Sequence, residues 1–236
     1  MKSFEKYWKN KTLSGHRHDS SIFYKDKVRE HLALLSDDEK KMDISDIGCG
    51  AGELLFYLEK ECNIVEAVDY SQSMLDKAKK LLRGKKLNFL IFDANSYIKQ
   101  TCSEVLFACG SFNQYLDKKD IENIVKTFRE SSSCRSMFLF DTIDPDKYEL
   151  WKQGRARYDR FFPSRKEILK LNVKEILGVF TGKYKQYMVE IGEMGYAYRP
   201  HYWSYLANQY DLDIEMVSSQ KYEYRYHVIL RKQEHK

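Results

Sequence analysis

Long apolar runs are missing from this sequence of 236 residues. No stretch approaches the roughly 18 consecutive apolar residues that a membrane-spanning helix needs. The first residues, MKSFEKYWKNK, also lack the apolar segment of a signal peptide. We therefore expect a cytoplasmic protein that has no membrane partner.

Paired cysteines and a strong excess of one charge are missing as well. The five cysteines are odd in number and none lies in a C-x-x-C motif, which argues against a disulfide framework or a zinc site. The net charge is only +5, so composition gives no support to a nucleic-acid partner. The length fits one α/β domain with an elaboration. The oligomeric state stays open, and a homodimer is one arrangement that we consider.

Residues 43–53, DISDIGCGAGE, are the most informative segment that is present. Asp43–Ile47 is typical of a short strand, and Gly48, Gly50 and Gly52 follow it directly. After the glycines the apolar spacing becomes helical. Glycines at such a position let the backbone turn tightly and let a ligand lie against it. The segment predicts a strand, a ligand-binding turn and a helix.

The glycine spacing departs from the dinucleotide fingerprint G-x-G-x-x-G, because position 53 is Glu53 and the third glycine comes one residue earlier. With Asp46 before the glycines and Glu53 after them, the segment resembles the first motif of the class I, Rossmann-like methyltransferases that use S-adenosylmethionine. The resemblance covers residues 42–142. It implies an α/β fold with a doubly wound, mostly parallel seven-stranded sheet. An ordinary tight turn of another α/β protein is the alternative.

Strands and helices alternate along the chain, as a doubly wound fold requires. The expected strands are residues 43–47, 64–68, 87–92, 105–108 and 137–140. The third of these is nearly all apolar and is expected to be buried on both faces. Helices are expected at 71–82, 118–132 and 200–210, and strands at 214–217 and 224–230 should close the sheet as a hairpin.

The resemblance also implies which residues bind the cofactor. Asp69 would accept hydrogen bonds from the ribose hydroxyls, and Asp93 with Ala94 would hold the adenine ring. Asp46 would organise the glycine loop or reach the methionine end. Each aspartate could instead be a helix cap or a surface carboxylate. The full expected set is Asp46, Gly48, Cys49, Gly50, Gly52, Asp69, Tyr70, Met74, Asp93, Ala94, Cys109 and Phe112.

The segment after the fourth expected strand, CGSFNQY at 109–115, is where the resembling family places residues around the sulfonium and the substrate. It contains no proline, unlike the Asp/Asn-Pro-Pro-aromatic run of many enzymes that methylate the amino groups of bases. The sequence therefore argues against that activity. Cys109 also lacks the neighbouring proline of a catalytic thiol, so we expect a small buried residue there.

Residues 143–199 form an insert longer than a crossover needs, with ten aromatic residues and a net charge of +4 from twelve basic and eight acidic residues. Ligands of open α/β sheets bind beyond the carboxyl ends of the strands, so this insert can cover the site. Arg155, Tyr158 and Arg160 are candidates for binding an anionic, ring-bearing substrate. A solvated helix face is the alternative. Residues 184–198 partly alternate and predict short antiparallel strands.

The N-terminal segment 1–42 contains an amphipathic stretch at 22–35. In the resembling family such a segment often folds over the cofactor as a lid, and packing on the sheet edge is the alternative. His18 in this segment and His201 in the late helix are candidate bases, although each could be a purely structural histidine. Metal-dependent methyltransferases of catechols need clustered acidic ligands after the fourth and fifth strands, where this sequence has only Asp141 and Asp144, so we predict no metal.

Together these features predict an enzyme that transfers a methyl group from S-adenosylmethionine to a small molecule. The expected reaction is O-methylation of a phosphorylated or nucleotide-linked sugar or a related metabolite. An RNA or protein methyltransferase and a non-catalytic S-adenosylmethionine-binding partner protein are the alternatives. The expected organisation is a lid at 1–42, a cofactor-binding core at 43–142, the insert at 143–199, and a closing helix and hairpin at 200–236.

Overall fold

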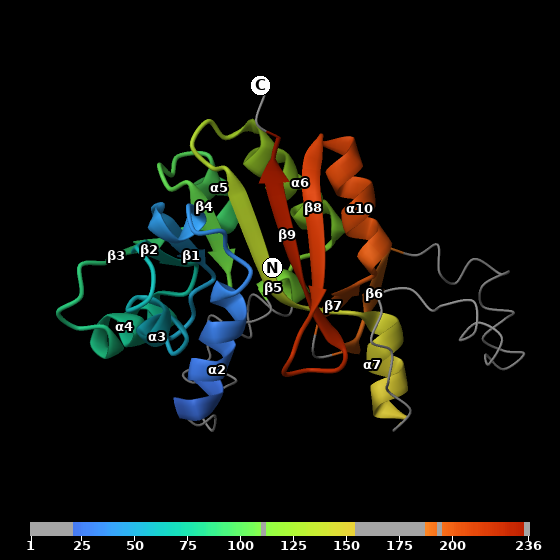
Figure 1. Cartoon of the computed structure of the whole chain (residues 1–236), viewed down its shortest axis with the longest axis horizontal. Coiled ribbons are helices and arrows are strands. Elements are labelled where there is room, and N and C mark those ends of the chain that lie inside the picture. The colour runs from blue at the N-terminus through green and yellow to red at the C-terminus, as the bar shows by residue number, and fades with distance from the viewer. Residues whose placement is uncertain (1–20, 110–111, 154–186, 193–194, 234–236) are drawn as a thin grey trace, which may run out of the picture.

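The structure is a computed structural model that describes residues 21–109, 112–153, 187–192 and 195–233. Its centre is a seven-stranded sheet with the order β3-β2-β1-β4-β5-β9-β8 (Figure 1). The strands are β1 (Ile44–Ile47), β2 (Ile64–Asp69), β3 (Asn88–Ile91), β4 (Val105–Ala108), β5 (Ser136–Ile143), β8 (Leu212–Ser218) and β9 (Arg225–Lys232). β1 to β5 run parallel, and β9 pairs antiparallel with both β5 and β8. The predicted doubly wound sheet with a closing hairpin is confirmed.

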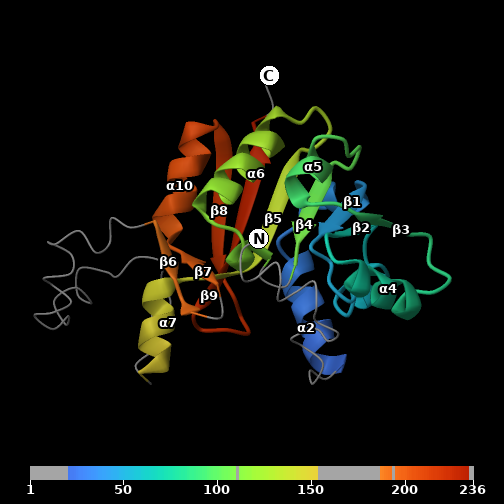
Figure 2. The same ribbon diagram turned by 180° about the vertical axis from the view of Figure 1, so that it is seen from behind.

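Helices cover both faces of this sheet. They are α2 (Ser21–Leu32), α3 (Leu55–Leu58), α4 (Gln72–Leu81), α5 (Ala94–Ile98), α6 (Lys118–Glu130), α7 (Pro145–Lys152) and α10 (Pro200–Gln209), with short 3-10 turns η1 (Glu39–Lys41) and η2 (Phe112–Tyr115). One apolar core joins the sheet to α5, α6 and α10, and Figure 2 shows these helices on the rear face. A second core joins the sheet to α2, α3 and the end of α4.

The helix expected at 118–132 corresponds to α6, and its local sequence explains both where it begins and which face it buries. Asp117 and Asp120 form a capping box at its start, and the four apolar residues expected to face inward are all buried. Those residues are Ile121, Ile124, Val125 and Phe128. The expected ribbon in the insert is also present, since β6 (Met188–Glu190) pairs antiparallel with β7 (Tyr196–Tyr198). No helix in the described ranges combines the length and the apolarity that crossing a bilayer requires.

The expectation that the third strand is buried on both faces is wrong. β3 lies at the edge of the sheet and pairs with β2. Ile91 is 53% exposed, and no residue of β3 is fully buried. An apolar run does not distinguish a central strand from an edge strand, because burial depends on what neighbouring elements cover.

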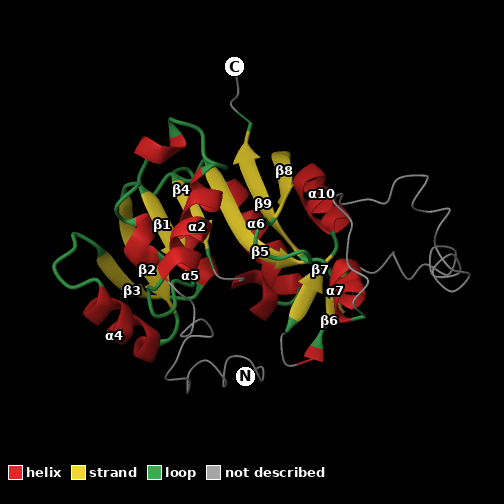
Figure 3. Ribbon diagram, turned by 60° about the horizontal axis from the view of Figure 1, so that its bottom comes forward, coloured by secondary structure: helices red, strands yellow, loops and turns green. Residues whose placement is uncertain are grey.

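The carboxyl ends of β1, β2, β4 and β5 meet at one edge of the sheet. β9 runs the other way, so Ile143 at the end of β5 pairs with Arg225 at the start of β9. The turn between β8 and β9 therefore lies at this same edge. α2 and α7 also project there, as Figures 1 and 3 show. Beyond this edge lies the position where ligands of doubly wound sheets bind.

Candidate cofactor-binding site

The glycine loop between β1 and α3 is pinned to the neighbouring strand. The backbone N–H groups of Gly48 and Cys49 both donate to the carbonyl oxygen of Val68, at 2.7 and 3.0 Å. Gly48, Gly50 and Gly52 have φ values of +74°, +58° and +82°, a region that residues with a Cβ rarely adopt. The sequence therefore needs glycine at these positions to let the loop turn back against β2.

Asp69, the last residue of β2, holds this loop from the other side. Its Oδ2 accepts a hydrogen bond from the Gly50 N–H at 2.9 Å, and its Oδ1 accepts one from the Ser71 N–H at 2.8 Å. Burial raises the pKa of this carboxyl, and these backbone donors oppose the rise. A carboxylate offers about four acceptor positions, so Asp69 keeps capacity for the two hydroxyls of a ribose.

The space around the loop fits a ligand that lies along its backbone. A Cβ added to Gly50 would have no heavy atom of the described residues within 4 Å, which leaves open space beside this residue. A Cβ on Gly48 would lie 2.6 Å from Cδ2 of Phe112, so the ring of Phe112 closes over the start of the loop. The structure thus brings Phe112, which follows β4, against the glycine loop, and its contact with a cofactor stays a prediction.

Gly52 sits at the contact between the loop and α4. An added Cβ would lie 3.1 Å from Ala78 Cβ and 3.2 Å from Leu82 Cδ1. Gly84 has almost the same φ, +85° against +82° for Gly52, but open space around it. We expect Gly84→Ala to lower the free energy of unfolding by about 1 kcal/mol and Gly52→Ala by about 1 kcal/mol more from overpacking. Urea denaturation of both variants measures this, and equal losses would contradict the close packing on α4.

Asp46, in β1, carries an unpartnered atom beneath the loop. Its side chain is fully buried, and its Oδ1 has no hydrogen-bond partner among the described residues. Burial raises the pKa of Asp46 to about 7, against hydrogen bonds from the backbone and thiol of Cys109. A carboxylate held in this way is suited to receive a cationic or hydrogen-bond-donating ligand group.

The raised pKa gives a prediction for stability against pH. The pKa of Asp46 in the folded protein lies above the ordinary value near 4. Its contribution to the free energy of unfolding is therefore fully present below about pH 4 and is lost as the pH rises through about 7. We expect the wild type to lose on the order of 1–3 kcal/mol between pH 5 and 8 from this group. Denaturation curves of Asp46→Asn should lack that loss of stability. Asp144, whose pKa is also raised, to about 6, provides the control: Asp144→Asn should keep the loss that comes from Asp46.

Asp93 lies after β3 and has a local structural role. It is the N-cap of α5, and its Oδ1 accepts a hydrogen bond from the Ser96 N–H at 2.9 Å. Burial raises its pKa, but this cap outweighs it, and the pKa falls below the ordinary value. The alternative role of helix cap is thus present, and the contact with an adenine ring, together with that of Ala94, stays a prediction.

The other expected cofactor residues lie nearby in the chain but make fewer defining contacts. Tyr70 follows Asp69 directly, and Met74 is buried in α4. Cys109 is buried at the end of β4, and burial raises the pKa of its thiol far above the ordinary value. Burial also raises the pKa of the Cys49 thiol well above its ordinary value. Neither thiol is therefore in the reactive thiolate form.

Of the candidate base and substrate residues, His201 lies within the described part of the chain. His201 lies in the first turn of α10, and its ring contacts that of Tyr187, 5.3 Å away between centroids. Burial lowers its pKa. His18, Arg155, Tyr158 and Arg160 fall outside the described residues, so their roles stay predictions.

Sequence reasoning missed a second group of polar residues at the same edge. Lys27, Glu30 and His31 of α2 face Asp141 of β5 and His227 of β9, and all five side chains are buried. A signal was available, because positions 27, 30 and 31 fall on one face of a helix. The apolar stripe of this helix alone does not predict that its polar residues point inward.

Comparison with known proteins agrees with this geometry. Residues 44–132 match the family described as "Methyltransferase domain". The chain is 24% identical over 169 residues to malonyl-[acyl-carrier protein] O-methyltransferase 2 of Ilyobacter polytropus, a match that covers 67% of this chain and 62% of that protein. A protein of Geobacillus sp. (strain WCH70) that carries a methyltransferase name is 25% identical over 165 residues, covering 68% of this chain and 63% of its own. The chain thus spans less than two thirds of the length of these curated relatives.

Solved structures share the fold at low sequence identity. Magnesium protoporphyrin IX methyltransferase from Synechocystis PCC 6803, solved with bound S-adenosylhomocysteine, gives a TM-score of 0.60 at 14% identity, covering 98% of this chain and 93% of that one. An S-adenosylmethionine-dependent methyltransferase from Leishmania major gives a TM-score of 0.62 at 13% identity, covering 96% and 80%. The domain match over residues 44–132, the shared fold and the way Asp69 holds the glycine loop together support a class I, S-adenosylmethionine-dependent methyltransferase domain in this chain.

Proposed function

We propose that this chain transfers a methyl group from S-adenosylmethionine to an oxygen atom of a small molecule. The observation that carries the proposal is the glycine loop pinned between Val68 and Asp69, with open space beside Gly50. When bound, the cofactor would supply an electrophilic methyl group: the electron pair of its bond to sulfur stays on sulfur, and a lone pair of the acceptor oxygen forms the new bond to carbon. The protein has to hold both molecules in line and remove the acceptor's proton.

The residues at the loop fit this cofactor. Asp69 would accept hydrogen bonds from the ribose hydroxyls, and the loop backbone at Gly50 would lie against the ligand. The buried, unpartnered Oδ1 of Asp46 would face the cationic methionine end. The ring of Phe112 already lies over Gly48, and it would either move aside or pack against the methionine end of the cofactor.

Aromatic and basic residues at the same edge support an anionic, ring-bearing acceptor. Tyr148 and Trp151 of α7 pack against Tyr224, and Trp151 remains 46% exposed. The Arg225 guanidinium lies over the rings of Tyr222 and Tyr224, at 5.0 and 5.5 Å. We propose a phosphorylated or nucleotide-linked sugar as the acceptor class, in which a base could stack and a phosphate could pair. The Ilyobacter relative, which is named an O-methyltransferase, supports oxygen as the acceptor atom.

The test has two stages. Calorimetric titration of the full chain with S-adenosylmethionine and S-adenosylhomocysteine should give binding, and its absence in well-folded protein would contradict the cofactor. Mass spectrometry across a panel of nucleotide sugars and sugar phosphates should then find a product heavier by one methylene unit. Methylation of RNA with steep salt dependence would favour an RNA methyltransferase instead. Binding with no product, alongside stable association with another chain, would favour a non-catalytic partner.

A further inference from the structure

The five buried polar residues that join α2 to the sheet form a cluster next to the cofactor loop: Lys27, Glu30, His31, Asp141 and His227. His31, Asp141 and His227 are fully buried, and Lys27 and Glu30 are at most 5% exposed. Asp141 lies inside β5 at an irregularity in its pairing with β9, with a φ of +58°. Such strained positions concentrate at functional sites. Burying this many polar groups requires either complete hydrogen bonding or a ligand that completes it.

The hydrogen bonds of the cluster are incomplete. Lys27 donates to Asp141 Oδ2, and His227 Nδ1 accepts from the Asp141 backbone N–H at 3.2 Å. His227 Nε2 lies 2.9 Å from Glu30 Oε1, so this nitrogen carries the proton and donates it. Three buried atoms have no hydrogen-bond partner among the described residues: His31 Nε2, Asp141 Oδ1 and Glu30 Oε2. The cluster therefore has unused capacity for a hydrogen-bonding group.

A metal ion does not fit this capacity as well as its spacing suggests. One ligand atom each from His31, Asp141 and His227 lies within 4.8 Å of the others, which is a spacing that a metal could use. However, the lone pair of His227 Nδ1 already accepts a hydrogen bond and Nε2 carries the proton, so metal binding by His227 would break a hydrogen bond. The ammonium of Lys27 also occupies the place beside Asp141 that a cation would take. A neutral hydrogen-bond donor such as a hydroxyl could bind without breaking a hydrogen bond of His227 and without displacing Lys27.

The cluster lies between the cofactor loop and the acceptor side. His31 Nδ1 is 4.0 Å from Sγ of Cys109, and Cys109 is hydrogen-bonded to Asp46 beneath the glycine loop. On the other side, Lys27 Nζ is 5.3 Å from the ring centroid of Tyr222. Arg225 Nη1 donates to the Asp141 carbonyl oxygen at 3.1 Å, and Arg225 lies over Tyr222 as well. The ring of Tyr222 therefore adjoins the cluster.

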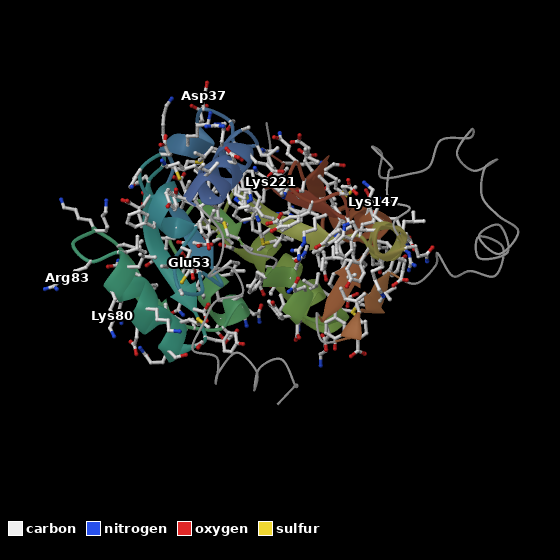
Figure 4. The ribbon with its side chains drawn as sticks, turned by 90° about the horizontal axis from the view of Figure 1, so that it is seen from below. Asp37, Glu53, Lys80, Arg83, Lys147 and Lys221 are labelled. Carbon is white, nitrogen blue, oxygen red and sulfur yellow. The ribbon has the colours of Figure 1, made fainter. Side chains whose placement is uncertain are left out.

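One residue of the cluster, Glu30, lines a surface cleft. A cleft of about 410 Å³ between α2 and the β8–β9 turn is lined by Glu30 and Lys221, with Asp26, Arg29, Ala33 and Gln220 completing its walls. In Figure 4, which views the molecule from below, Lys221 is seen together with Glu53 of the cofactor loop and Lys147 of α7. Glu30 is therefore the member of the cluster that borders this cleft, whereas His31 and Asp141 are fully buried.

We propose that His31 Nε2 and Asp141 Oδ1 form the subsite for the hydroxyl group of the methyl acceptor, and that His31 is the base that takes its proton. This inference rests on the proposed function. The acceptor O–H bond breaks, its proton forms a bond to His31 Nε2, and the electron pair stays on the oxygen that receives the methyl group. Asp141 then stabilises the imidazolium that results, while Lys27 fixes the orientation of Asp141.

The charges around His31 agree with this role. Burial lowers its pKa well below the ordinary value, as do the charges of Lys27 and His227, whereas Asp141 opposes them. Cys109 faces it from β4 with a thiol that stays protonated. His31 is therefore neutral near pH 7, with a free lone pair on one ring nitrogen. The acceptor proton can move onto it without any earlier deprotonation.

The test uses the full chain, labelled with ¹⁵N at histidine and saturated with S-adenosylhomocysteine, and phenol as the probe. Phenol joins one hydroxyl to one ring that can stack on Tyr222. We expect phenol to shift the ring-nitrogen signals of His31 saturably and to leave those of His201 unchanged. Anisole, in which a methyl replaces the hydroxyl proton, should bind at least tenfold more weakly. His31→Gln should lose phenol binding to a similar degree and keep S-adenosylhomocysteine affinity within twofold.

Several results would overturn the subsite. These are no saturable phenol binding, phenol binding without a response of His31, a response of His201 in its place, or equal binding of anisole. Tight binding of ZnCl₂ or MnCl₂ that is lost in His31→Gln would identify a metal site instead. If His31→Gln does not fold, the wild-type titration still decides. Failure to bind S-adenosylhomocysteine would overturn the proposed function, whereas its binding without a His31 response overturns the subsite alone.

Discussion

Replacing Lys27 by methionine is expected to lower the free energy of unfolding by about 3–5 kcal/mol. Lys27 is 3% exposed and forms an ion pair with Asp141, which is fully buried. Methionine keeps the length and much of the volume of lysine, so packing changes little. The buried carboxylate of Asp141 would lose its main counter-charge, and that uncompensated charge is the main cost. Urea denaturation monitored by circular dichroism measures the difference.

Two further variants separate this charge effect from other causes. Lys25→Met, on the exposed face of the same helix, should change stability by less than about 0.5 kcal/mol. The double variant Lys27→Met/Asp141→Asn should recover a large part of the loss, because it removes the unpaired charge. Asparagine tolerates the positive φ of this position. A double variant as unstable as Lys27→Met would show that the lysine acts through packing.

Replacing Asp69 by alanine is expected to weaken the binding of S-adenosylhomocysteine by about 1.5–3 kcal/mol, roughly 10- to 150-fold in Kd. Asp69 accepts hydrogen bonds from Gly50 and Ser71, and the proposal adds the ribose hydroxyls. Alanine would remove the acceptors for the ligand and would also release the loop backbone at Gly50. Isothermal titration calorimetry of both proteins measures the loss.

Matched controls show which part of this loss comes from the ligand contact. Asp69→Asn keeps the shape and one acceptor oxygen, so it should lose less affinity than Asp69→Ala. Asp76→Ala, which removes an exposed carboxylate from neighbouring α4, should bind as tightly as the wild type. Wild-type affinity in Asp69→Ala would mean that the ribose lies elsewhere.

Local patterns were enough to predict the strand–glycine–helix unit, because the steric freedom of glycine and the alternation of strands are encoded within a few residues. The position of Asp69 followed from the end of an apolar run. The inward-facing polar residues of α2 were different. Lys27, Glu30 and His31 are buried because β5 and β9 supply Asp141 and His227, which are more than 100 positions away in the chain. The helical spacing of the three residues shows that they share a face, but not that distant strands bury that face.

The dependence of burial on distant residues also explains why the sequence did not predict that β3 is an edge strand. Residues 87–92 are apolar enough for a central strand, but their burial depends on whether another strand pairs with their free side. The bulge at Asp141 is also set by pairing, since the register between β5 and β9 shifts between Leu139 and Thr142. Strand order is a property of the whole sheet, so such features require the tertiary structure.

The contacts between α2 and the strand β9 also set the order in which the molecule can be completed during synthesis. Glu30 and His227 are separated by 197 positions, and Arg231 pairs with Glu39 across 192. A ribosome-bound chain that has not yet released β9 lacks both partners, although the glycine loop and Asp69 have already emerged. The nascent chain can therefore assemble its cofactor loop well before the polar groups of α2 find their partners. Proteolysis that removes the last strand would return the molecule to that earlier stage.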